Sequence, residues 1–344
     1  MGADATRLSF LHYALGGGLG HLVRQWGIAH ALQKQSAGKS KSTIVTTSEF
    51  APTVAKRVAQ LDHDRVQFKI LSPNCLPDEA KKLMEDLIAT ERFACLIVDV
   101  FPRGLGGELV GCFAKYSNLP KVLVARNLPA AYLQNLRIEP FVRSNYKQVF
   151  RIEPYAPFEK LPQSQLTCPV VFQPETANEP GSVAGRQDER RVLVVGSGTS
   201  SECNALRDLS NKLQAIASKS DASDDLRLCN FSYYGPTPDL NDDQFSWPLS
   251  ARLNGFDLVI GNAGYNLFWE TKLAQIPAIL FARRRKYDNQ VLRSEVRWPI
   301  QVNDLLGMIG SKLQPAPEST CSIPRGNSID DLAASILNLL KFAN

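Results

Sequence analysis

The sequence predicts an α/β protein built from two Rossmann-like domains, each with a doubly wound parallel sheet. Short apolar or β-branched runs alternate with helical patterns, as they do in βαβ units. The alternation stops near residue 173 and restarts near residue 190. A chain of 344 residues is long enough for two domains. We therefore expect the functional site in a cleft between two such domains.

The first domain is expected to span residues 1–172. Its predicted strands are 8–15, 42–47, 66–71, 94–100 and 121–125, with an edge strand at 148–152. Its predicted helices are 21–35, 51–60, 78–92 and 106–116. The run at 94–100 is apolar without alternation, which is typical of a central strand covered on both faces.

Residues 173–189 are rich in Pro and Gly and poor in large apolar residues, which predicts a linker. The second domain, 190–327, has predicted strands at 191–195, 227–231, 257–260 and 278–281. Its predicted helices are 202–218, 265–274 and 287–296. The last segment, 328–344, contains an amphipathic helix at 328–342 whose apolar face needs a surface to pack against.

Composition excludes several classes of protein. With 44% hydrophobic and 21% charged residues, each half has enough apolar residues for a core. A net charge of +5 without long basic blocks does not indicate a nucleic-acid partner, and the basic run 283–286 is typical of a solvated loop. The seven cysteines contain no CxxC pair, so neither a zinc site nor a disulfide framework is predicted. Without a signal peptide or a transmembrane run, we expect a cytoplasmic protein.

Each half begins with a strand that leads through glycines into a helix. The first turn contains Gly17, Gly18 and Gly20 before His21, and the second contains Ser197, Gly198 and Thr199. Glycine allows close approach, and a helix N-terminus attracts anions. The first turn does not match the GxGxxG spacing of dinucleotide-binding folds, because the third glycine position falls on His21 or Val23.

His21 is the candidate general base. A helix N-terminus disfavours the imidazolium form, and a neutral imidazole can accept a proton. The alternative is that His21 merely caps the helix. His12 and His30 are expected to be structural, and His63 to lie in an exposed turn.

The second half contains the densest group of polar candidates. Asn262 and Gly264 follow one predicted strand, Glu270 lies inside the next helix, and residues 288–290 follow the next strand. In open α/β sheets, ligands bind at the carboxyl edge, where these residues are expected. The alternative is that they are ordinary helix caps.

These motifs resemble the glycosyltransferase-B (GT-B) superfamily, in particular the branch of the bacterial N-acetylglucosaminyl transferase of peptidoglycan synthesis. The resemblance rests on residues 17–21, 264–270 and 288–290. Residues 99–104 with Glu108, and residues 126–129, are similar to a group of predicted bacterial glycosyltransferases.

The resemblance implies that the C-terminal domain holds a nucleotide sugar and the N-terminal domain an acceptor. By that analogy Glu270 would bind the ribose, and Asp288 with Gln290 the sugar. The full set of implied donor-side residues is Ser197, Gly198, Thr199, Asn262, Gly264, Tyr265, Asn266, Glu270, Asp288, Asn289 and Gln290. The implied acceptor-side set is Gly17, Gly18, Gly20, Arg24, Arg103 and Arg126. The terminal helix would cross back onto the first domain.

The function expected from this resemblance is transfer of a hexosyl or N-acetylhexosaminyl group from a nucleoside-diphosphate sugar, with a UDP-sugar as donor. Such enzymes need neither a metal nor another cofactor, because helix dipoles and amides stabilise the leaving diphosphate. A nucleotide-sugar hydrolase, an epimerase of the same fold and a non-catalytic nucleotide-sugar-binding protein remain alternatives. Peripheral contact with a membrane also stays open.

Overall fold

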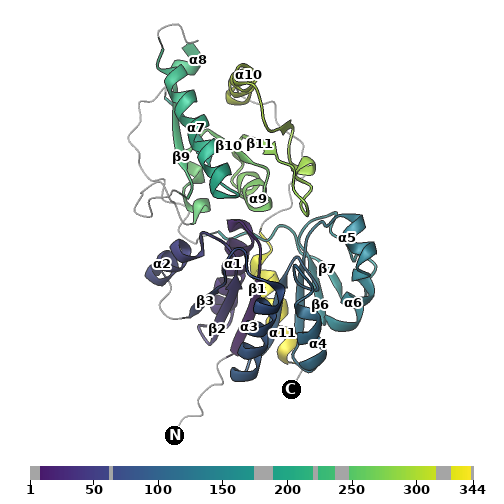
Figure 1. Ribbon diagram of the computed structural model, residues 1–344. Coiled ribbons are helices and arrows are strands. Elements are labelled where there is room, and N and C mark those ends of the chain that lie inside the picture. Colours follow the sequence, from purple (N-terminus) through teal and green to yellow (C-terminus); the bar gives the residue numbers. More distant parts are fainter. Residues whose placement is uncertain are drawn as a thin grey trace. The chain divides into compact units, whose positions relative to one another are not determined.

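A computed structural model describes residues 8–61, 65–173, 189–219, 224–236, 248–314 and 327–341. The chain divides into two compact units (Figure 1). Unit 1 comprises Met1–Phe172 with Gly326–Asn344, and unit 2 comprises Gln173–Arg325. The predicted linker lies almost entirely outside the described residues, as do His63 and Cys321.

Unit 1 contains a seven-stranded parallel sheet in the order β3-β2-β1-β4-β5-β6-β7. Successive strands are therefore added toward one edge of the sheet up to β3 and toward the other edge from β4 onward, so the strand order reverses between β1 and β4. Its strands are β1 (Leu8–Ala14), β2 (Ser40–Thr46), β3 (Val66–Ile70), β4 (Cys95–Asp99), β5 (Lys121–Ala125), β6 (Gln148–Arg151) and β7 (Ser164–Leu166). The predicted edge strand is β6, but β7 pairs beyond it. The three residues of β7 are too few and too polar to produce a strand pattern.

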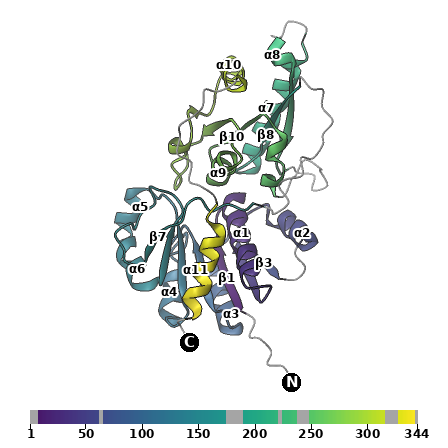
Figure 2. The same ribbon diagram turned by 180° about the vertical axis from the view of Figure 1, so that it is seen from behind.

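The helices of unit 1 cover both faces of this sheet. They are α1 (Leu19–Gln35), α2 (Ala51–Leu61), α3 (Pro77–Thr90), α4 (Leu109–Lys115), α5 (Ala130–Asn135), α6 (Ile138–Asn145) and α11 (Ile329–Lys341). Buried side chains of α3, α4 and α6 pack on one face, which includes Leu11, Tyr13 and Val98. Figures 1 and 2 show α3 and α4 on this side of the sheet and α11 on the other side.

Helix α11 returns from the far end of the sequence and packs against α1. Its apolar face is buried as the pattern at 328–342 predicts, with Leu332 and Ile336 fully inaccessible. Asn327, just before the helix, clamps the backbone of Val171. Its Oδ1 accepts the Val171 amide at 3.2 Å and its Nδ2 donates to the Val171 carbonyl at 2.5 Å. The end of the chain is therefore a structural part of unit 1.

Unit 2 contains a five-stranded parallel sheet in the order β12-β11-β10-β8-β9. Its strands are β8 (Arg190–Val195), β9 (Cys229–Tyr234), β10 (Leu258–Asn262), β11 (Ala278–Ala282) and β12 (Val296–Arg297). Its helices are α7 (Ser200–Ala217), α8 (Asp224–Arg227), α9 (Tyr265–Leu273) and α10 (Val302–Leu313), with short 3-10 turns η1 (Leu249–Ala251), η2 (Leu253–Gly255) and η3 (Gln290–Arg293). Two cores, one against α7 and α10 and one against α9, cover the two faces of the sheet.

The helix predicted at 287–296 is wrong. Only the 3-10 turn η3 forms there, followed by the short strand β12. Val291 and Leu292 are about half exposed, so they do not form an apolar helix face packed on the core. Ser294 instead directs its hydroxyl to the Leu280 carbonyl at the edge of the sheet. Among the described helices of both units, none is long and apolar enough to cross a bilayer.

Candidate functional site

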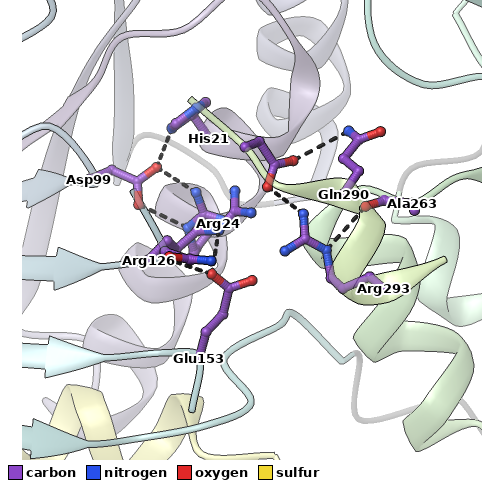
Figure 3. A network of polar contacts seen from close by, with 10 residues as sticks. His21, Arg24, Asp99, Arg126, Glu153, Ala263, Gln290 and Arg293 are labelled. Carbon is purple, nitrogen blue, oxygen red and sulfur yellow. Dashed lines mark hydrogen bonds and ion pairs between the residues drawn. The ribbon is translucent and has the colours of Figure 1, made fainter. Parts of the chain in front are cut away.

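His21 lies in the first turn of α1, which follows the N-cap residue Gly18 at the carboxyl end of β1. Its Nδ1 donates to Asp99 Oδ2 at 2.6 Å, and its side chain keeps 19% exposure (Figure 3). The ring stacks on Phe101 at a centroid distance of 5.9 Å. Gly16 leaves room for this ring, because a Cβ at residue 16 would lie 2.4 Å from His21 Cδ2. The imidazole is therefore held from three sides and still reaches solvent.

Asp99 ends β4, the strand that pairs with β1 at the point where the strand order reverses. Its carboxylate is fully buried, and burial alone would raise its pKa. The charges of Arg24 and His21 and their hydrogen bonds outweigh burial and hold the pKa of Asp99 well below its usual range. Asp99 is thus an ionised acceptor at neutral pH.

An ionised carboxylate can only accept hydrogen bonds, so the proton of a neutral His21 ring lies on Nδ1. The Nε2 atom is then the basic nitrogen. Asp99 fixes the tautomer and direction of the ring and stabilises an imidazolium formed on it, as the orienting carboxylate does in a catalytic triad. This pair can accept a proton from a hydroxyl group or a water molecule.

The chain after Asp99 is strained. Val100 has φ of +69°, a left-handed conformation that is unfavourable for a β-branched residue. The turn at Val100 brings Phe101 beneath the His21 ring. Further on, the Glu108 carboxylate accepts the Tyr13 hydroxyl and the amides of residues 105 and 106, which holds this loop to β1. Strain maintained by such surrounding contacts is common at functional sites.

The residues of the expected acceptor side have different environments. Gly17 and Gly20 face open space, because a Cβ added at either residue would meet no atom within 4 Å. Arg24 is fully buried and donates twice to Asp99. Arg103 donates to the Leu136 carbonyl at 2.8 Å, and Arg126 lies 3.6 Å from Glu153. The three arginines are therefore held by the protein itself, whereas Gly17 and Gly20 face open space.

In unit 2, Asn262 at the end of β10 connects the two strands at which the strand order reverses. Its Nδ2 donates to the Ser197 carbonyl after β8 at 2.7 Å, and its Oδ1 accepts Arg283 Nε at 2.6 Å. Gly198 has φ of +106°, and a Cβ there would lie 1.9 Å from Glu202 Oε2. Ser197 and Gly198 thus form a tight turn that only glycine at residue 198 allows.

The N-terminus of α7 is closed by its own residues. Thr199 caps the helix, and Glu202 accepts the Thr199 amide at 2.9 Å to complete a capping box. Arg285 donates to Glu202 Oε2 at 2.6 Å, and Arg283 Nε lies 3.9 Å from Glu202 Oε1. The basic run 283–286 is therefore only partly a solvated loop: Arg284 and Lys286 are exposed, but the other two arginines are half-buried around Glu202.

Helix α9 has a different N-terminus. Its N-cap residue is Gly264, which has no side chain to cap the helix, and the first turn contains no acidic residue. Glu270 lies inside this helix with 6% exposure, and no other described residue pairs with its carboxyl. Burial raises the pKa of Glu270 to about 7. Tyr265 is buried beside Trp269, whereas Asn266 is half-buried.

Asp288 and Gln290 form a locked cluster with Arg293, and Figure 3 labels Gln290 and Arg293. Asp288 Oδ1 accepts Arg293, and Asp288 Oδ2 accepts Gln290 Nε2 at 3.3 Å. Arg293 Nε also donates to the Ala263 carbonyl at 3.1 Å, so the cluster is attached to the turn before α9. Gln290 Oε1 accepts the Arg283 amide at 3.0 Å, and Asn289 is exposed.

Sequence reasoning missed the roles of Asp99, Glu202 and Arg293. Asp99 had a usable signal, since it is an acidic residue at the end of an apolar central strand. Glu202 also had one, because Thr199 and Glu202 have the spacing of a capping box. Arg293 had none, because its contacts depend on how the turn at residues 288–293 folds. Among the described residues, no group of three or more His, Cys, Asp or Glu is placed to hold a metal ion.

No family model and no curated protein matches the chain. Solved structures do. TcCGT1 in complex with UDP covers 98% of this chain and 100% of its own at 12% identity and a TM-score of 0.60. UDP-GlcNAc 2-epimerase from Neisseria meningitidis, bound to UDP-GlcNAc, covers 97% and 100% at 10% identity and a TM-score of 0.58. Spinosyn rhamnosyltransferase SpnG, complexed with thymidine diphosphate, covers 97% and 96% at 15% identity and a TM-score of 0.51.

At such identities the likeness shows the fold. It extends over nearly the whole chain, including both parallel sheets. The fold predicted from residues 17–21, 264–270 and 288–290 is therefore confirmed: the chain has the GT-B fold.

Proposed function

We propose that this protein transfers a sugar from a nucleoside-diphosphate sugar to an acceptor hydroxyl, with His21 as the general base. The observation that carries the proposal is the His21–Asp99 pair. One ring nitrogen is bound to a buried, ionised carboxylate, and the side chain keeps access to solvent. Such a pair is suited to accept a proton as the acceptor oxygen attacks the sugar.

In the proposed reaction, the acceptor oxygen forms a bond to the anomeric carbon as the bond to the diphosphate breaks. The acceptor proton moves to His21 Nε2, and Asp99 stabilises the resulting imidazolium. The electron pair of the broken bond leaves with the nucleoside diphosphate. Two of the similar structures were solved with UDP or UDP-GlcNAc, which favours a UDP-sugar as donor here.

We place the diphosphate at the N-terminus of α9 rather than at that of α7. Glu202 adds a negative charge in the first turn of α7, and it completes the capping box with Thr199. The start of α9 has no such charge and no side-chain cap. Its helix dipole favours an anion, and the leaving diphosphate gains the same stabilisation.

Glu270 is the proposed ligand of the ribose. It is a buried carboxyl without a partner among the described residues, so its oxygens are available to accept hydrogen bonds from a ligand. The two ribose hydroxyls are donors of the required kind. Asp288 and Gln290 are proposed to contact the sugar, in an orientation fixed by Arg293.

The test combines donor binding with turnover in the full-length protein. Nucleoside diphosphates and their sugars are screened by thermal shift, because a ligand of the folded state raises the Tm. The best donor, labelled in its sugar, is then incubated with and without pooled small-molecule and lipid acceptors. We expect labelled product only with acceptor. Free sugar from the donor alone would indicate a hydrolase, and an altered sugar still attached to the nucleotide would indicate an epimerase.

The role of His21 is tested with His21→Ala. We expect turnover to fall by about 10²–10⁴, the usual contribution of a general base, while donor binding stays unchanged. His30→Gln is the matched control, because His30 lies on the same helix and packs against Phe172 rather than Asp99. Unchanged turnover in His21→Ala would exclude His21 as the base.

A further inference from the structure

We infer that Arg24 is a positioning residue that controls how readily His21 accepts a proton, acting through the carboxylate of Asp99. This inference rests on the proposed role of His21 as base. Arg24 follows His21 by about one turn of α1, and its side chain is fully buried. A buried guanidinium is costly unless it is paired, so its partner indicates what it does.

One partner of Arg24 is the carboxylate that also binds His21. Arg24 Nε donates to Asp99 Oδ1 at 2.8 Å, and Arg24 Nη2 donates to Oδ2 at 2.7 Å. The same Oδ2 accepts His21 Nδ1 at 2.6 Å. A two-point contact with a planar guanidinium fixes the plane of the carboxylate. It therefore also fixes the direction from which Asp99 meets the imidazole.

The contact has an electrostatic consequence. A lone carboxylate next to an imidazole stabilises the protonated ring, and a ring that is already protonated cannot act as a base. Arg24 compensates the charge of Asp99 and leaves its hydrogen-bonding geometry intact. His21 is thus oriented by a carboxylate whose attraction for an imidazolium is reduced.

The other ionisable groups near this cluster do not replace Arg24. His12 on β1 is fully buried between Gln25 and Ser42, and burial lowers its pKa to about 4, so it is neutral. Arg126 after β5 and Glu153 after β6 lie 3.6 Å apart and have opposite charges. The hydrogen bonds that lower the pKa of Asp99 come instead from Arg24 and His21. Arg24 is therefore the cation that compensates this carboxylate.

The test is an NMR titration of the full-length protein labelled with ¹⁵N at histidine, without substrate. The chain has four histidines, so the His21 signals are assigned by their loss in His21→Gln. Arg24→Met removes the charge, and Arg24→Lys keeps the charge but loses the two-point contact. We expect Arg24→Met to raise the pH midpoint of the His21 titration by about one unit or more, the effect of one adjacent charge. Arg24→Lys should keep the midpoint near that of the wild type and weaken the preference for a proton on Nδ1.

Repeating Arg24→Met in an Asp99→Asn background tests the route of the effect. Because the substituted asparagine carries no charge, we expect a smaller shift there than in the background with the native carboxylate. The double variant also leaves no uncompensated buried charge, so it should fold even if Arg24→Met alone does not. Equal shifts in both backgrounds, or an unchanged midpoint in folded Arg24→Met and an unchanged tautomer in Arg24→Lys, would overturn the inference. None of these results depends on turnover, so the proposed function can fail independently.

Discussion

At the scale of single residues, unit 1 places two buried charges beside one imidazole. Asp99 and Arg24 are both fully buried, and burying charges costs free energy that a plain apolar core would avoid. Their contacts converge on His21, the member of the cluster that keeps access to solvent. The arrangement is understandable if His21 does chemistry, and would have no evident benefit if it only capped α1.

Glu270 is the corresponding residue of unit 2, and its burial predicts a pH dependence of stability. Its pKa is raised from 4.5 to about 7. The folded state therefore holds this proton more tightly than the unfolded chain, so the stability contribution is complete below about pH 4.5 and is lost as the pH rises through 7. Glu270→Gln cannot ionise and should not show this loss.

We therefore expect Glu270→Gln to have a higher Tm than the wild type at pH 8.5 and a similar Tm at pH 4.5. The difference in unfolding free energy at high pH should be on the order of 3 kcal/mol. Thermal unfolding measured at both pH values checks this expectation. Glu139 forms an exposed ion pair with Arg143, so Glu139→Gln is the control and should change the Tm at neither pH. If Glu270→Gln were less stable than the wild type at pH 8.5, burial would not be raising the pKa of Glu270 in the folded state.

The same variant should bind UDP more weakly, because an amide replaces the carboxylate acceptor of the ribose hydroxyls. Wild-type affinity should rise between pH 6 and pH 8 as Glu270 ionises. The phosphate of UDP titrates in the same range, so the quantity of interest is the difference between the wild type and Glu270→Gln. Calorimetric titrations with UDP across this pH range measure the affinity of both proteins. If the wild type and Glu270→Gln gave parallel pH profiles, Glu270 would be excluded as a ligand of the ribose.

At the scale of elements, the turn between β1 and α1 contains one glycine that is packed against His21 and one that faces open space. A Cβ at Gly16 would collide with the His21 ring, whereas one at Gly17 would meet nothing within 4 Å. Gly16→Ala must displace the imidazole or the turn, and a misplaced base loses much of its effect. Gly17→Ala has no such contact.

We expect Gly16→Ala to lose at least about ten-fold in turnover while donor binding is preserved, and Gly17→Ala to stay close to the wild type. Steady-state kinetics with the donor identified by thermal shift measures both. Neither residue lies inside α1, so helix propensity does not contribute to the difference. If the two variants lost turnover equally, the turn as a whole rather than the position of His21 would be responsible.

At the scale of the whole molecule, a helix from the C-terminal part of the sequence, α11, packs against a helix from the N-terminal part, α1. Helix α11 buries Leu332 and Ile336 completely and packs against α1, the helix that carries His21 and Arg24. Deleting a buried leucine side chain costs the transfer free energy of its methyl groups and leaves a cavity. That cost should fall on unit 1.

We expect Leu332→Ala to destabilise unit 1 by about 2–5 kcal/mol. Hydrogen exchange followed by mass spectrometry should then show faster exchange in α1 and unchanged exchange in the strands of unit 2. Asn338→Ala, on the exposed face of the same helix, is the matched control. Unaltered protection of α1 in Leu332→Ala would mean that α11 does not support it.

Local patterns were enough to predict both parallel sheets, the two glycine turns and the amphipathic helix at 328–342, and they indicated His21 as a candidate base. These features depend on neighbours in sequence: the period of apolar residues, glycine before a helix, and polar residues after a strand. These local patterns gave a wrong prediction where contacts between residues distant in the sequence determine the structure. A helix was predicted at 287–296, but Arg293 donates to Asp288 and to the Ala263 carbonyl, and only a 3-10 turn forms there.

The sequence by itself determined which residue types stand at the ends of the strands, and from these the fold and a candidate base. Only the tertiary structure decided that Asp99 holds His21 and Arg24, which lie 78 and 75 positions away in the chain. It also decided that Glu202 closes the start of α7 while Glu270 stays unpaired among the described residues. The reason is that strand order, not spacing along the chain, sets which strand ends become neighbours, and no local pattern encodes that order.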